Sequence, residues 1–99
     1  MAEKTTLVVT AAPNPDEMAS VQEYLKGVLP LLMAAGGRLV KRLKVDRMIR
    51  GNRSGMVLVM DFDSAESISA MFESDDYAAL IPARDRGFTE MSIMLTNEM

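Results

Sequence analysis

This chain contains a strand-like run whose side chains are apolar on both faces. Met56-Val57-Leu58-Val59-Met60 stands between a turn-rich segment and Asp61-Phe62-Asp63. Leu7-Val8-Val9, flanked by threonines, has the same character. A strand of an antiparallel sheet that has one face in water should alternate apolar and polar residues. A sheet built around these two runs must therefore be covered on both faces.

Turn and capping residues predict the order of the other elements. Strands are expected over residues 5–11, 38–45, 56–62 and 88–96. A first helix should start after Asn14 and end at Gly36-Gly37. A second helical segment should follow Asp63 or Ser64, restart at Ser74 and stop at Gly87. The order β-α-β-β-α-β predicts one α+β domain over residues 1–99, a ferredoxin-like fold with a four-stranded antiparallel sheet.

The two helices can cover only one face of such a sheet. The first and third strands, which carry the two-sided runs, are central in this topology. The simplest cover for the second face is the same sheet from another copy of the chain. Mean hydropathy is +0.06, high for so small a domain, which can hide only part of its surface by itself. The sequence therefore predicts a homodimer with facing sheets, a dimeric α+β barrel.

The composition excludes several kinds of chemistry. The chain has no cysteine and no histidine, so disulfides, thiol nucleophiles, Ser-His-Asp triads and His-ligated haem are impossible. Its ten methionines are attributed to core filling, and no metal or cofactor is expected. The longest uncharged run, residues 27–37, is too short to span a bilayer. With no secretory signal at the start, the expectation is a cytoplasmic protein without membrane contact.

Several short motifs together carry a family resemblance. They are Tyr24 with Pro30 six residues later, Gly36-Gly37-Arg38, Phe62-Asp63-Ser64-Ala65-Glu66, and Phe72-Glu73-Ser74-Asp75-Asp76-Tyr77-Ala78-Ala79-Leu80 with Arg84 beyond. From about Leu7 to Ile93 the chain resembles a bacterial domain-of-unknown-function family of small dimeric α+β barrels. The wider superfamily includes cofactor-independent monooxygenases, muconolactone isomerases and haem-degrading enzymes. The resemblance implies the fold and the dimer; at the hairpin tip the chain has Arg50-Gly51, where the family often has an acidic residue.

One group of candidate site residues is predicted around Asp61. Asp61 shares strand parity with Val57 and Val59 and should lie on the sheet face away from the helices. If Leu39 and Leu43 face the helices, Arg38 and Arg42 lie on the same side as Asp61. The more common outcome is a salt bridge within the sheet. The functional alternative is a polar cluster that binds an anionic or carbonyl ligand.

Two further candidates lie on the predicted helices. Arg84 shares an apolar stripe with Tyr77, so its stem can pack while its charged end reaches solvent, or it can serve as a pocket cation. Tyr24 lies at the edge of the first helical stripe. It is either a half-buried packing residue or a hydroxyl donor in a pocket, and Tyr77 has the same two readings.

The sequence is compatible with three functions. The first is a small-molecule-binding homodimer, with Asp61, Tyr24, Arg38, Arg42 and Arg84 as the polar groups of a cavity between helices and sheet. The second is a cofactor-independent isomerase or monooxygenase acting on a small carbonyl or aromatic compound. Asp61 would be its catalytic base, Arg38 or Arg84 its oxyanion stabiliser and Tyr24 its proton donor.

The third and remote function is a nucleic-acid or protein interaction module. Residues 38–53 carry seven basic residues and one acidic residue, which would suit a phosphate backbone. The segment has no aromatic residue for base stacking, and the net charge of the whole chain is -3. Nucleic-acid binding is therefore not expected.

Overall fold

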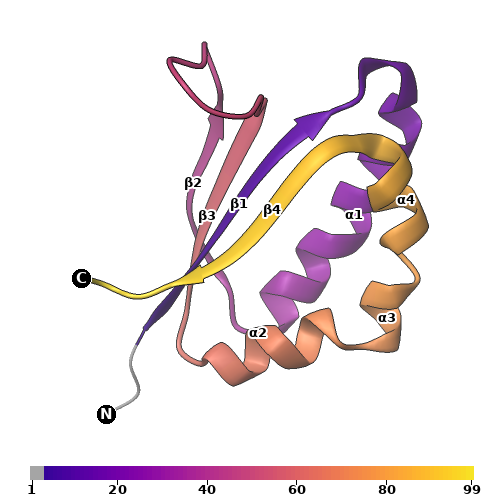
Figure 1. Cartoon of the computed structure of the whole chain (residues 1–99). Coiled ribbons are helices and arrows are strands. Elements are labelled where there is room, and N and C mark those ends of the chain that lie inside the picture. The colour runs from indigo at the N-terminus through magenta and orange to yellow at the C-terminus, as the bar shows by residue number, and fades with distance from the viewer. Residues whose placement is uncertain (1–3) are drawn as a thin grey trace.

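The protein is described by a computed structural model that covers residues 4–99. Its elements in chain order are β1 (Thr5–Pro13), the short 3-10 turn η1 (Pro15–Glu17), α1 (Met18–Ala34), β2 (Arg38–Lys44), β3 (Met56–Phe62), α2 (Ala65–Phe72), α3 (Asp75–Ala78), α4 (Ile81–Gly87) and β4 (Phe88–Thr96). Figure 1 shows the four strands as one twisted layer with all the helices on one side. The predicted β-α-β-β-α-β order is confirmed, with the second helix divided into three pieces.

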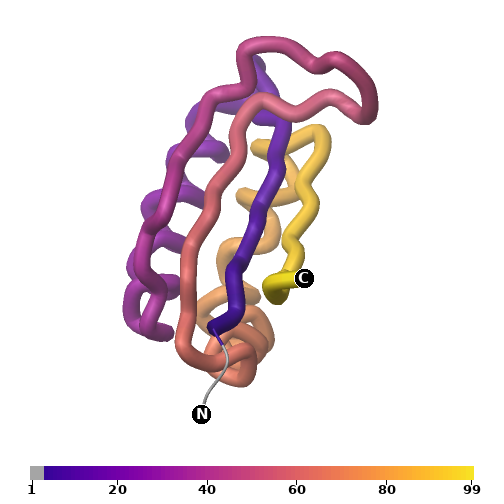
Figure 2. Tube along the Cα trace, turned by 90° about the vertical axis from the view of Figure 1, so that its left-hand side faces the viewer, coloured from indigo at the N-terminus to yellow at the C-terminus, as the bar shows by residue number. Residues whose placement is uncertain are grey.

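The sheet has the strand order β2-β3-β1-β4, and each neighbouring pair is antiparallel. The two central strands are β3 and β1, as the two-sided runs predict. In their register Val8 pairs with Val59 and Thr6 with Asp61. Figure 2 looks onto the sheet from the side without helices, so that the strands lie in front and the helices behind. The fold is ferredoxin-like and α+β.

Polar caps begin the helices where the sequence predicts them. The side chain of Asn14 accepts from the N–H of Asp16, at the turn that leads into α1. Ser64 accepts from the N–H of Ser67 at the start of α2, and Ser74 caps α3 in the same way. Each cap satisfies a backbone donor that has no partner inside its helix.

The C-terminal end of α1 depends on two glycines. Gly36 has φ +95°, a left-handed conformation that favours glycine. Its N–H donates to the carbonyl of Met33, and the N–H of Gly37 donates to that of Leu32. These two bonds form a Schellman motif, which ends the helix and turns the chain into β2. Gly37 also leaves room for Phe62, because a Cβ there would lie 2.7 Å from the Cζ atom of that ring.

The core fills the space between the helices and one face of the sheet. On β3 the inward side chains are Leu58, Met60 and Phe62, all buried, while the side chains between them point the other way. The other large buried core residues are Leu7, Val21, Tyr24, Val28, Leu32, Ile68, Met71, Tyr77 and Phe88.

The opposite face of the sheet has no helix over it, and we call it the open face (Figure 2). Its apolar side chains are Val8, Leu43, Val57, Val59 and Met94, placed there by the strand register. Leu43 and Met94 remain 48% and 41% exposed. The face that the sequence predicts to need a cover is therefore apolar and uncovered within one chain.

One strand departs from the predicted alternation. The register of β2 against β3 shifts between Leu39 and Lys41, and a single extra residue reverses the faces beyond it. Arg42 pairs with the buried Leu58 and therefore lies on the helix side, whereas Leu43 lies on the open face. The expectation that Arg42 shares a face with Asp61 is wrong. In the sequence the departure shows only as Lys41, which interrupts the apolar parity of Leu39 and Leu43.

Candidate ligand-binding site

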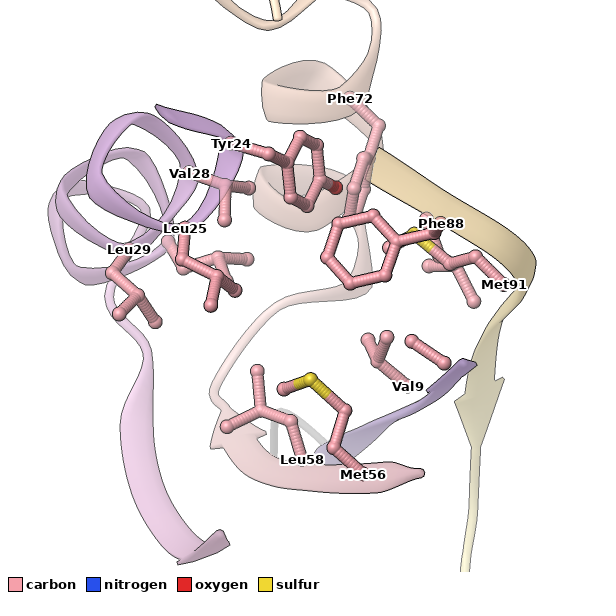
Figure 3. Close-up of a pocket in the computed structure, with 13 residues that line it drawn as sticks. Val9, Tyr24, Leu25, Val28, Leu29, Met56, Leu58, Phe72, Phe88 and Met91 are labelled. Carbon is pink, nitrogen blue, oxygen red and sulfur yellow. The ribbon is translucent and has the colours of Figure 1, made fainter. Parts of the chain in front are cut away.

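A narrow apolar slot lies between α1 and the helix-facing side of β1, β3 and β4 (Figure 3). Its lining residues are Val9, Ala11, Tyr24, Leu25, Val28, Leu29, Leu32, Met56, Leu58, Phe72, Phe88, Met91 and Ile93. Its volume is about 30 Å³, which suits a water molecule better than an organic ligand. The flexible side chains of Met56 and Met91 are only half-buried, so the slot can widen on their side.

A wider and more polar depression of about 510 Å³ adjoins this slot. Arg84 and Asp85 of α4 line it, together with residues of β4. Phe88, Met91 and Ile93 belong to both linings. The apolar slot and the charged depression thus share one wall.

Two buried tyrosines and one arginine connect the slot with the depression. The hydroxyl groups of Tyr24 and Tyr77 lie 2.9 Å apart, and a guanidinium nitrogen of Arg84 donates to the Tyr77 hydroxyl at 3.2 Å. The Nε atom of Arg84 donates to Asp85 at 3.1 Å. The tyrosines are 4% and 2% exposed, and the edge of the Tyr24 ring meets Phe88 as well. We call these three residues the Tyr-Tyr-Arg chain.

The Tyr-Tyr-Arg chain is built to donate hydrogen bonds. Burial raises the pKa of Tyr24 far above its ordinary value, and its hydrogen bond with Tyr77 raises that pKa further. Tyr24 therefore keeps its hydroxyl hydrogen at any physiological pH. The hydrogen bond to Tyr77 also raises the pKa of Arg84, which stays positively charged. These groups can bind an oxygen acceptor, and Tyr24 cannot serve as a base.

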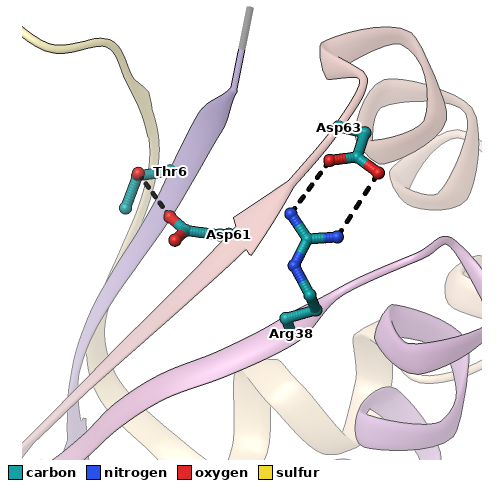
Figure 4. A network of polar contacts seen from close by, with 4 residues as sticks. All are labelled: Thr6, Arg38, Asp61 and Asp63. Carbon is teal, nitrogen blue, oxygen red and sulfur yellow. Dashed lines mark hydrogen bonds and ion pairs between the residues drawn. The ribbon is translucent and has the colours of Figure 1, made fainter.

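Asp61 and Arg38 belong to a separate polar region at the C-terminal end of β3 (Figure 4). The Thr6 hydroxyl donates to Asp61 at 2.7 Å. Arg38 lies opposite Asp61 in the register, but its guanidinium binds both carboxylate oxygens of Asp63, at 2.9 and 3.3 Å. That hydrogen bonding lowers the pKa of Asp63, although both side chains are well exposed and solvent screens the pair.

The five predicted site residues do not line one cavity. Tyr24 and Arg84 meet through Tyr77, whereas Asp61 and Arg38 lie on the open side of the sheet. Arg42 is exposed on the helix side of β2 and joins neither group.

Sequence reasoning did not give Tyr77 and Asp63 their roles. Tyr77 was expected mainly to pack, although its spacing of seven residues from Arg84 on one helical stripe was a usable signal. Asp63 was considered only as a helix cap, and Ser64 takes that role instead. Asp63 follows β3 directly, two residues beyond the register partner of Arg38, and its pairing with Arg38 depends on strand register, which no local pattern reveals.

The basic segment ends in a long exposed loop between β2 and β3. Ile49 at its tip is 92% exposed, and Arg47, Arg50 and Arg53 are exposed around it. The loop is tied to the sheet at its base, where the N–H of Gly55 donates to a β1 carbonyl. A role of this loop in binding nucleic acid or protein stays a remote prediction.

None of the helices within residues 4–99 has the length and apolar character needed to cross a bilayer. In the same residues no three carboxylate side chains gather as ligands for a metal ion. The predicted cytoplasmic location remains an expectation.

The sheet, its one-sided helical layer and the apolar slot between them define a small ferredoxin-like α+β protein. More specifically, the chain belongs to the family described as Domain of unknown function (DUF1330), whose model matches residues 5–99. This confirms the resemblance to a domain-of-unknown-function family. Among curated proteins, none matches the sequence.

Solved structures with the same fold are only distantly related in sequence. A protein of unknown function from Rhodopseudomonas palustris has a TM-score of 0.81 at 14% identity, with 100% of this chain and 85% of that chain covered. A dimeric protein of unknown function with a ferredoxin-like fold, from Bacteroides fragilis, has a TM-score of 0.62 at 10% identity, with 96% of each chain covered. A proposed antibiotic biosynthesis monooxygenase from Nitrosomonas europaea has a TM-score of 0.64 at 10% identity, with 100% and 93% covered.

Proposed function

We propose that this chain is a homodimer whose two open faces pack together. The apolar side chains of the open face support this, because water over a central pair such as Val8 and Val59 costs free energy that a second sheet would recover. A two-fold axis lets one surface cover itself, and a relative from Bacteroides fragilis is described as dimeric. Sedimentation equilibrium at micromolar concentration should give about twice the chain mass of 10.9 kDa. A single species of the chain mass would contradict the dimer.

The function that the geometry supports best is binding of a small organic molecule with an apolar body and an anionic or carbonyl oxygen. The apolar body would occupy the widened slot, and the oxygen would lie toward Arg84. The observation that carries this proposal is the shared wall of Phe88, Met91 and Ile93, which joins the apolar slot to a depression lined by Arg84, Asp85 and Glu90. Such a combination of apolar walls and few polar groups is usual in ligand sites.

Titration with hexanoate, a short chain with one carboxylate, tests this binding. In protein labelled with ¹³C at the methionine methyl groups, the signals of Met56 and Met91 should shift, because both side chains line the slot. The signal of Met48, which lies in the exposed loop, should not. Leu29→Phe should fill the slot and weaken hexanoate binding at least about tenfold, equivalent to about 1.4 kcal/mol.

Leu31→Phe is the matched control for this titration. Leu31 lies two residues further along α1 and is also half-buried, but it does not line the slot. The affinity of the Leu31→Phe variant for hexanoate should stay within about twofold of the wild-type affinity. That is well under the tenfold that corresponds to about 1.4 kcal/mol. Equal weakening by the two substitutions, or methyl shifts confined to Met48, would place hexanoate elsewhere.

A cofactor-independent isomerase or monooxygenase is the second candidate, favoured by the likeness to a proposed monooxygenase. In that case Asp61 would be the base, and Asp61→Asn should lower the rate while ligand affinity is kept. Asp61 and Tyr24 lie on opposite sides of the sheet, so within one chain they cannot act on the same substrate atom. Unchanged turnover in Asp61→Asn would remove Asp61 from any reaction.

A further inference from the structure

The Tyr-Tyr-Arg chain contains one more hydrogen-bond donor than it can use. Tyr24 and Tyr77 have one hydroxyl hydrogen each, and the bond between their oxygens uses one of the two. Arg84 can only donate, so it cannot accept the second hydrogen. Within residues 4–99 these hydroxyl groups have no other hydrogen-bond partner. One hydrogen in a pair that is at least 96% buried is therefore left without an acceptor.

A leftover donor at this depth is costly and points to a missing partner. Buried polar groups in proteins are almost always hydrogen-bonded, and an unsatisfied one costs about 1–3 kcal/mol. Arg84 fixes the favourable direction, because each hydroxyl that accepts a hydrogen bond becomes a better donor to the next group. In this order Arg84 donates to Tyr77 and Tyr77 donates to Tyr24. The hydrogen without an acceptor is then that of Tyr24.

Tyr24 is the member of the chain that lines the slot. Figure 3 shows its ring entering from α1 beside Phe88, with the hydroxyl directed away from the helix. We propose that Tyr24 donates its hydroxyl hydrogen to a carbonyl or carboxylate oxygen of the ligand, and that Tyr77 and Arg84 position and polarise this donor. This inference rests on the proposed ligand binding and names the group that is recognised.

The hydrogen-bonding chemistry of the Tyr-Tyr-Arg chain selects the class of ligand. Since the pKa of Tyr24 is raised, its hydroxyl remains a donor and is matched to an oxygen acceptor rather than to an ammonium group. The remaining slot residues have no oxygen or nitrogen in their side chains, so the rest of the ligand must be apolar. Small ketones, aldehydes and carboxylic acids with an alkyl or aromatic body fit this description.

An isosteric pair of probes tests the hydrogen bond separately from binding itself. In 2-hexanone a carbonyl oxygen takes the place of the terminal CH₂ group of 2-methyl-1-hexene. Wild-type protein should bind the ketone about 3- to 10-fold more tightly, the usual contribution of one net hydrogen bond. Tyr24→Phe should reverse this preference, because the ketone oxygen would then be buried without a donor, and should leave the affinity for the alkene unchanged. Methionine-methyl NMR provides both affinities.

Infrared spectroscopy of ¹³C-carbonyl 2-hexanone gives a readout that packing alone would not move. In the wild-type complex the carbonyl stretch should shift to lower wavenumber than in hexane, because a hydrogen bond weakens the C=O bond. Tyr24→Phe should abolish the shift. Arg84→Met, which keeps both hydroxyls but removes the charge that polarises them, should reduce it. Arg86→Met, at an exposed position two residues along α4, should leave it unchanged.

The outcomes separate this inference from the proposed function. Equal binding of ketone and alkene by the wild type would overturn the inference and leave a ligand-binding slot. A ketone preference that survives in Tyr24→Phe would also overturn it. If Tyr24→Phe fails to fold, an unshifted carbonyl stretch in the wild-type complex decides against the inference. If neither probe nor hexanoate shifts the Met56 and Met91 signals, the proposed binding fails and takes the inference with it.

Discussion

Met94→Glu should dissociate the homodimer. Met94 lies on the open face opposite Val8, and in a dimer with facing sheets a carboxylate there would be buried without a partner. A two-fold axis places the substitution twice in one interface, so the cost is counted twice. We expect the dimer dissociation constant to rise at least about 100-fold, equivalent to about 2.7 kcal/mol. Sedimentation equilibrium over a range of concentrations measures the change.

Met33→Glu is the matched control for the dimer. Met33 is 57% exposed on α1, against 41% for Met94, and it lies on the side of the molecule away from the open face. The same substitution there should leave the dissociation constant within about threefold of the wild-type value, about 0.6 kcal/mol. Val59→Glu, at a central position of the open face, should dissociate the dimer as Met94→Glu does. A dimer that tolerates both open-face substitutions would have to use another surface.

Phe62→Ala should cause a large loss of stability. Phe62 is 0% exposed, at the end of β3, and its ring packs directly on Gly37. Removing a fully buried phenylalanine ring costs about 3–5 kcal/mol, because transfer free energy is lost and a cavity remains. Since a small domain has about 5–15 kcal/mol of stability in total, much of the free energy of unfolding would disappear.

Urea unfolding followed by circular dichroism measures this loss. The comparison needs one protein concentration throughout, since dimer formation contributes to the apparent free energy of unfolding. Phe72→Ala is the matched control, because Phe72 is only half-buried and should lose clearly less. An equal loss in the two variants would show that Phe62 is not the more important core residue.

Most of the fold could be predicted because its signals are local. The Asn14 and Ser64 caps, the Gly36-Gly37 ending of α1 and the start of β4 at Phe88 depend on residues within a few positions of one another. The two faces of β3 followed from the period of two along a strand, which places Asp61 on the side opposite Phe62. The face of Asp61 was confirmed for that reason.

The candidate site was predicted less well because its contacts are not local. Tyr24 and Tyr77 are 53 positions apart, and no pattern around either residue indicates that their hydroxyls meet. The register shift in β2 reversed Arg42 relative to Arg38, which removed one member of the predicted cluster. Arg38 pairs with Asp63 rather than with Asp61, because the chain turns toward α2 just beyond β3.

By itself the sequence determined the element order, the α+β class and the excess of apolar surface on the central strands, since each depends on periodicity and on turn residues. Only the tertiary structure decided which polar groups share a site. Hydrogen bonds such as that between Tyr24 and Tyr77 reach about 3 Å, whereas residue patterns fix a side chain only to a face. A single bulge or helix break moves a side chain by more than that distance.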